Sequence, residues 1–108
     1  MIDFKEIAEE LDFDIEDVMM LIDMYLESAQ DSIENIVVAI KANDLETIKN
    51  EAHAIKGSSA NLKLDDIRIL AKEIELSATE NQAIDYHAVI SKLYEKIELL
   101  KEAVTDYA

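Results

Sequence analysis

The chain has 108 residues with 25 acidic and 10 basic side chains, a net charge of −15, one glycine, and neither proline nor cysteine. Its length suits one domain over residues 1–108 with a single core, and its charge disfavours nucleic acid and anionic lipid as partners, because both repel an acidic surface. Disulfides and thiolate metal sites are excluded, and no run predicts a membrane span or a signal peptide, so we expect a soluble, cytoplasmic protein.

The apolar residues predict helices along the whole chain, which lacks the glycine and proline that build hairpins and tight turns. A short helix is expected over about 4–11. Apolar residues then recur at steps of three and four and predict long helices over about 14–42 and 44–62. Two further stripes predict helices over about 64–78 and 86–104. The fold class is therefore all-α.

Polar residues at the predicted helix starts fit N-caps, because their side-chain oxygens can accept from free N–H groups of the first turn. Asn43, with Glu46 three residues later, resembles a capping box. The connections over 42–44, 62–64 and 80–85 are short, which favours antiparallel neighbours. We expect an up-down antiparallel four-helix bundle with a short extra N-terminal helix as a lid. The other candidate caps are Asp3, Asp14 and Asp85.

The sequence lacks the constellations of an autonomous enzyme. It has no cysteine nucleophile, no Gly-rich phosphate loop and no calcium-loop frame. A di-iron bundle requires a glutamate three residues before each histidine, but Asn50 and Ile84 stand at that spacing from His53 and His87. We therefore expect no metal site, no cofactor and no kinase activity of its own.

The lone glycine, Gly57, lies inside the second long helix, where glycine costs about 1 kcal/mol relative to alanine. On a helical wheel it shares a stripe with Lys49, His53 and Lys56, beside the apolar stripe. A neutral imidazole is a nucleophile, and flanking lysines attract an anionic phosphoryl group. The alternative is a solvated histidine on a lysine-bearing surface, with Gly57 merely allowing close helix packing.

The histidine-containing phosphotransfer (HPt) domains of bacterial phosphorelays carry a motif, His-x-Leu-Lys-Gly-Ser-Ser, that residues 52–62 (AHAIKGSSANL) closely resemble. Residues 70–71 (Leu-Ala) and 74–75 (Ile-Glu) match the Leu-x-x-Leu-Glu spacing of the family's next helix. The phosphotransfer domains of chemotaxis kinases are more distantly similar. Family members usually have glycine where Lys63 stands, so we expect Lys63 or a neighbour to be left-handed.

This resemblance implies that His53 is the phospho-acceptor and carries phosphate on its outward ring nitrogen. Lys56 would neutralise the phosphoryl group, and Gly57 would leave room for a partner's active-site loop. Glu75 would accept from the inner ring N–H and fix the tautomer, the alternative being a solvated helix acid. Lys49 matches no fixed family position, so its role in docking rests on helical geometry alone.

Met20 and Met24 form an apolar pair pointing away from the core stripe of the first long helix. They either receive the N-terminal helix or offer an adaptable docking surface for a partner. Ser58 and Ser59 are expected to serve helix packing, and His87 is expected to be an ordinary exposed residue.

The resemblance thus predicts a phosphocarrier. A receiver phosphoaspartate gives its phosphoryl group to His53, which passes it to another receiver aspartate. The Mg²⁺ belongs to the receiver, and a hybrid histidine kinase is a further candidate partner of this expected monomer. Two alternatives stay open: an acidic helical adaptor or nucleic acid mimic without phosphotransfer, and a phosphotransfer domain excised from a larger kinase.

Overall fold

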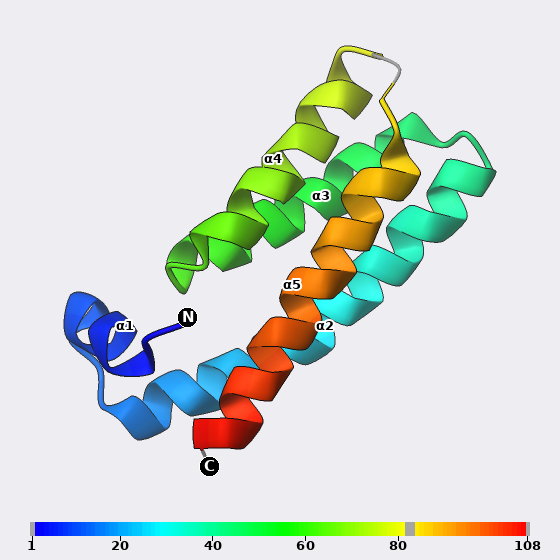
Figure 1. The fold of residues 1–108 in the computed structure, drawn as a ribbon. Coiled ribbons are helices and arrows are strands. Elements are labelled where there is room, and N and C mark those ends of the chain that lie inside the picture. The colour runs from blue at the N-terminus through cyan, green and yellow to red at the C-terminus, as the bar shows by residue number, and fades with distance from the viewer. Residues whose placement is uncertain (1, 82–83, 108) are drawn as a thin grey trace.

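The computed structural model describes residues 2–81 and 84–107, which contain five α-helices and no strand (Figure 1). The all-α prediction is confirmed, and the helices begin and end close to the positions that the apolar periodicity indicated. The helices are α1 (Phe4–Leu11), α2 (Ile15–Lys41), α3 (Leu45–Asn61), α4 (Asp65–Thr79) and α5 (Tyr86–Tyr107).

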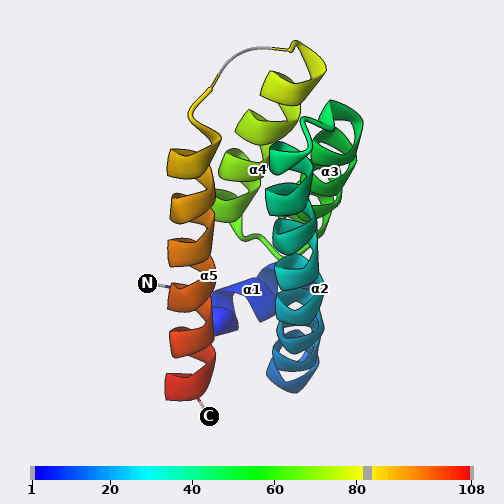
Figure 2. The same cartoon turned by 90° about the vertical axis from the view of Figure 1, so that its right-hand side faces the viewer.

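The four long helices contact one another in a closed ring, in which α2 packs on α3, α3 on α4, α4 on α5, and α5 on α2. Figures 1 and 2 show the chain reversing direction from each long helix to the next. The molecule is elongated, with extents of 41 × 22 × 19 Å. Helix α1 contacts α2 at one end, where its Phe4 meets Tyr107 of α5 edge-on, with ring centroids 5.7 Å apart.

The core consists of the apolar stripes facing the centre of this ring. Isoleucine dominates it, and burial of each such side chain contributes about 1.5–3 kcal/mol relative to exposure. Helix α1 adds Phe4 and Ile7 at the end of the core. The largest fully buried apolar side chains are Val18, Ile22, Ile33, Ile36, Ile48, Ile55, Ile74, Leu93, Ile97 and Leu100.

Residues other than glycine hold the left-handed conformation after four helices. After α3 the residue is Lys63, as predicted, with φ of 60°. Its N–H donates to the Ala60 carbonyl at 3.2 Å, and the Leu64 N–H donates to the Ser59 carbonyl at 2.9 Å. This is a Schellman pattern, which turns the chain from α3 into α4 within three residues. The other positions are Asp12, Asn43 and Asn81.

The N-cap of α3 is Asp44, so the capping-box prediction for Asn43 and Glu46 is wrong. The Asp44 carboxylate accepts from the Thr47 hydroxyl at 2.6 Å and from the Thr47 N–H at 3.2 Å. These bonds lower the pKa of Asp44. Asn43 instead has φ of 53° at the end of α2. The short connection needs a left-handed residue first and a cap second, which moves the cap by one position.

Three predicted caps lie where the sequence placed them. Asp3 accepts from the Glu6 N–H at 3.1 Å, and Asp85 accepts from the Ala88 N–H at 3.0 Å. Asp14 occupies the N-cap position of α2, but its side chain makes no capping hydrogen bond. The start of α2 is instead stabilised by Glu16 and Asp17 in its first turn, because their negative charges interact favourably with the positive end of the helix dipole.

One buried hydrogen bond joins α2 to α3. The Tyr25 and Ser59 hydroxyls are 2.7 Å apart, with side chains 5% and 0% exposed. Burial raises the pKa of Tyr25 to about 12, against the smaller opposing effect of its bond to Ser59. Because Ser59 follows His53 on the same helix, this pair fixes the rotation of the helix that carries the histidine.

Loss of this pair should destabilise the fold cooperatively. We expect Tyr25→Phe to lower the free energy of unfolding by about 1–3 kcal/mol, because the Ser59 hydroxyl is left buried without a partner. Ser59→Ala should have a comparable effect, and the double variant should cost less than the sum of the two. Urea unfolding of the four proteins measures this coupling, and strictly additive losses would contradict it.

Candidate functional site

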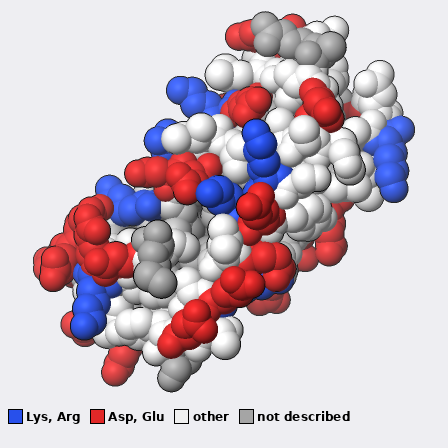
Figure 3. Space-filling view, viewed as in Figure 1, with Lys and Arg blue, Asp and Glu red and all other residues white. Residues whose placement is uncertain are grey.

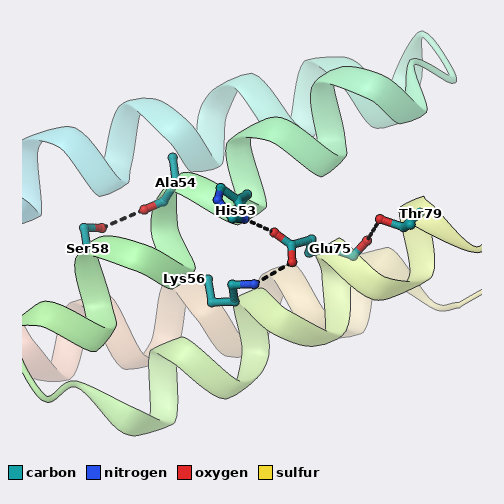
Figure 4. Close-up of polar contacts among 6 residues, drawn as sticks. All are labelled: His53, Ala54, Lys56, Ser58, Glu75 and Thr79. Atoms are coloured by element: carbon teal, nitrogen blue, oxygen red, sulfur yellow. Dashed lines mark hydrogen bonds and ion pairs between the residues drawn. The ribbon is translucent and has the colours of Figure 1, made fainter.

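Helices α3 and α4 bring His53 and Glu75 together across 22 residues of sequence (Figure 4). The His53 Nδ1 lies 2.5 Å from the Glu75 Oε2. The Lys56 Nζ, one turn further along α3, donates to the Glu75 Oε1 at 2.6 Å. The Glu75 carboxylate thus contacts both His53 and Lys56, which the sequence predicts to lie on one stripe of the helix. The predicted contact between His53 and Glu75 is present in the structure.

The three side chains differ sharply in exposure. The His53 side chain is 71% exposed, that of Lys56 is 29% exposed, and that of Glu75 is 15% exposed. The carboxylate is therefore sheltered between the helices, whereas the imidazole projects from the surface. The alternative of Glu75 as a solvated acid is wrong.

The pKa of Glu75 is held below its ordinary value of 4.5. Burial favours the neutral acid, but the hydrogen bonds from Lys56 and His53, together with electrostatic attraction to both side chains, outweigh it. Glu75 is consequently a carboxylate at neutral pH. A carboxylate only accepts hydrogen bonds, so the proton of a neutral His53 resides on Nδ1 and the lone pair on Nε2. The arrangement leaves a nucleophilic nitrogen facing away from Glu75.

The surface of α3 around His53 is low, in the sense that small residues form it. Gly57 is exposed, and a Cβ at this position would meet no described atom within 4 Å beyond its chain neighbours and the adjoining backbone of α3. The interpretation that Gly57 permits close helix packing is therefore wrong, because no neighbouring helix approaches it. Ala54 and Ala60 on the same helix are also exposed. A partner can thus approach closely enough to reach the imidazole.

Two lysines of the predicted stripe have different surroundings. The Lys56 ammonium is bound to Glu75, whereas the prediction for Lys56 was a contact with the phosphoryl group alone. Lys49 lies one turn before His53 and pairs with Glu46 of its own helix at 3.5 Å. Lys49 is thus outside the hydrogen-bonded group, and its role in docking stays a prediction.

Met20 and Met24 are 56% and 62% exposed on α2. Helix α1 buries its own apolar residues elsewhere, so the alternative that it covers the two methionines is wrong. Both methionines remain candidates for contact with a docking partner, because α2, which carries them, packs against α3. Ser58 donates back to the Ala54 carbonyl at 3.0 Å, and His87 is exposed as expected.

Within residues 2–81 and 84–107, no group of three or more His, Cys, Asp or Glu side chains is arranged to hold a metal ion. In the same residues, no helix has both the length and the apolar character needed to cross a bilayer.

A family model for the Hpt domain matches residues 20–106, which include the whole hydrogen-bonded group of α3 and α4. The chain belongs to the Hpt domain family. It is accordingly a histidine phosphotransfer protein of phosphorelays, in a family whose members are phosphocarriers and interact with receiver domains.

The fold is similar to that of histidine-containing phosphotransfer protein B from Pseudomonas aeruginosa PAO1, with a TM-score of 0.76. The two chains are 20% identical, and the superposition covers 96% of this chain and 88% of the other. No curated protein matches the sequence. At this level of identity, the solved structure supports the fold, whereas the family match supports the class of function.

The lowered pKa of Glu75 predicts a pH-dependent contribution to stability. The unfolded chain binds a proton on Glu75 more readily than the folded chain does. The contribution of ionised Glu75 to the free energy of unfolding is therefore complete above pH 4.5, and it is lost as pH falls through the lower pKa of the folded state. We expect the unfolding free energy of Glu75→Gln to fall less than that of wild type between about pH 5.5 and 3. Urea unfolding across this range provides the measurement.

The matched control is Glu73→Gln, an exposed glutamate on the same helix with no ion pair among the described residues. If Glu73→Gln changes the pH profile as much as Glu75→Gln does, the network around Glu75 does not carry the effect.

Proposed function

We propose that His53 is the phospho-acceptor of this phosphocarrier, taking the phosphoryl group from a receiver phosphoaspartate and passing it to another receiver aspartate. The observation that carries the proposal is an exposed imidazole whose inner nitrogen is bonded to a sheltered carboxylate. The alternative of an acidic adaptor does not explain why this histidine is paired with a sheltered carboxylate.

Transfer from the receiver is a displacement at phosphorus. The Nε2 lone pair of His53 attacks, an N–P bond forms, and the P–O bond to the aspartyl carboxylate breaks, so that the carboxylate leaves with the electron pair. The Nδ1 proton stays in place, and the positive charge that develops on the ring is stabilised by Glu75. The reverse displacement, by the aspartate of a second receiver, regenerates neutral His53.

Lys56 is placed to neutralise the phosphoryl group. An ammonium has three donors, of which one is bonded to Glu75, and Lys56 stands three residues after His53 on the same helix. A further donor is free to turn toward an anionic group on Nε2, with the charge-assisted bond contributing about 1.5–3 kcal/mol. The Mg²⁺ of the reaction is expected in the receiver, where it would neutralise the leaving carboxylate.

The remaining features of the proposal concern organisation. We take residues 1–108 as one domain, built as an up-down antiparallel four-helix bundle with α1 as a lid, acting as a cytoplasmic monomer. Receivers would dock on the low surface at Gly57, with Lys49, Met20 and Met24 at its border. A hybrid histidine kinase is a further candidate partner.

The direct test is incubation with Mg²⁺ and a phosphorylated receiver. Wild type should gain a phosphate that is labile to acid and stable to base, and His53→Gln should gain none. His87→Gln, which changes the exposed histidine of α5, serves as the matched control and should be phosphorylated like wild type. Equal labelling of wild type and His53→Gln would refute the proposal.

Substitution of Gly57 should separate stability from transfer. Gly57→Ala should raise the free energy of unfolding by up to about 1 kcal/mol, because the position is helical and open. Gly57→Leu should nevertheless slow transfer from the receiver by about tenfold or more, since a side chain now stands under the partner.

Ala88→Leu, an exposed alanine on α5, is the control and should leave the transfer rate unchanged. Chemical denaturation and single-turnover transfer together give both quantities. An unaltered transfer rate in Gly57→Leu would exclude this face as the docking surface.

A further inference from the structure

A second feature lies at the end of the molecule that holds α1. It is a cleft of about 600 Å³ between α1, the connection from α3 to α4, and the C-terminal half of α5. Its floor includes buried Ile7 and Leu64 and the half-exposed Leu99. Seven carboxylates and two lysines also line it. Figure 3, drawn in the orientation of Figure 1, shows acidic side chains gathered at this end.

Within the described residues, two of the seven carboxylates form ion pairs, Asp65 with Arg68 at 3.4 Å and Asp66 with Lys96, and the others form none. Asp66 pairs with Lys96 at 3.3 Å, whereas Glu6, Glu10 and Glu102 are exposed and have no ion pair within the described residues. Helix α5 also lacks a basic residue in its last turn. The negative end of its dipole therefore adds to the field of the carboxylates. Low-dielectric walls concentrate such a field inside a concave surface.

The cleft is separate from the proposed phosphotransfer site. Lys63 lines the cleft at the end of α3, ten residues after His53. At 1.5 Å per residue, His53 lies about 12 Å along the helix axis from Asn61, the last residue of α3, after which the chain turns toward the cleft. His53, Lys56 and Glu75 are absent from the lining of the cleft. An occupant of the cleft can therefore leave the imidazole accessible.

We propose that this cleft binds a basic amphipathic segment of a partner protein. Lysine or arginine side chains can lay their aliphatic stems over Leu64 and Leu99 while their charged ends reach the carboxylates. The apolar face of the segment fills the floor, and complementary charge speeds the encounter. Anionic ligands are repelled, and an inorganic cation leaves the apolar floor unused. The inference rests on the cleft alone and is independent of the proposed phosphotransfer.

The test uses a fluorescein-labelled synthetic peptide of twelve residues, with lysines on one helical face and leucines on the other. Fluorescence anisotropy measures its binding to the full chain, and ¹H–¹⁵N NMR spectra locate it. A peptide of the same composition with scrambled order keeps the charge but loses the apolar face. We expect the amphipathic peptide to bind at least about fivefold more tightly, with shifts concentrated at the cleft.

A pair of charge variants separates the cleft from general acidity. Glu10→Gln with Glu102→Gln removes two carboxylates from the cleft, and Glu27→Gln with Glu34→Gln removes two exposed carboxylates from α2. The cleft variant should bind the peptide roughly tenfold more weakly, whereas the α2 variant should change affinity by less than about twofold. Leu99→Ser should weaken binding by several-fold while leaving the salt dependence in place.

Three results would overturn the proposal. These are equal binding of the ordered and scrambled peptides, equal effects of the two charge variants, and NMR shifts spread over the whole acidic surface. Each would mean that the protein attracts cations through its net charge alone. Thermal unfolding of every variant shows that a loss of binding does not reflect a loss of fold.

Discussion

The whole site depends on one carboxylate. Glu75 accepts from His53 with one oxygen and from Lys56 with the other, so it fixes the tautomer of a neutral His53 and holds the Lys56 ammonium close to the imidazole. Its position follows from the α3–α4 pair, whose connection is only three residues long and ends in the Schellman pattern at Lys63. The Tyr25–Ser59 bond sets the rotation of α3 from the other side. The geometry of the His53–Lys56–Glu75 group is thus a consequence of how α3 and α4 are aligned.

The fold could be predicted largely from periodicity, because a chain with one glycine and no proline offers few alternatives to helices. The conformations of the turns could be predicted less well. Asn43 and Asp44 are both good capping residues, and only the three-dimensional path of the connection decides that Asn43 is left-handed and Asp44 is the cap. The sequence also could not show where α1 packs, since Phe4 and Ile7 fit more than one apolar surface equally well.

The site, too, could be predicted from the sequence only in part. His53 and Gly57 could be selected from the sequence because a motif and an unusual helical glycine coincide there. The Lys56–Glu75 bond could not, because it depends on the relative rotation of two helices, which residue spacing does not determine. Exposure was equally out of reach: a glycine facing a neighbouring helix and a glycine facing solvent look identical in a sequence, and only the open space at Gly57 separates them.

The four left-handed residues at helix ends have an evolutionary consequence. None of them is glycine, although glycine takes this conformation with the least steric opposition, and Lys63 has no short side chain to satisfy its own backbone. The single glycine lies instead inside α3, where it weakens the helix but keeps one face open. Adaptation to higher temperature therefore has positions available in the connections, outside the His53–Lys56–Glu75 group, where a single substitution by glycine can relieve backbone strain.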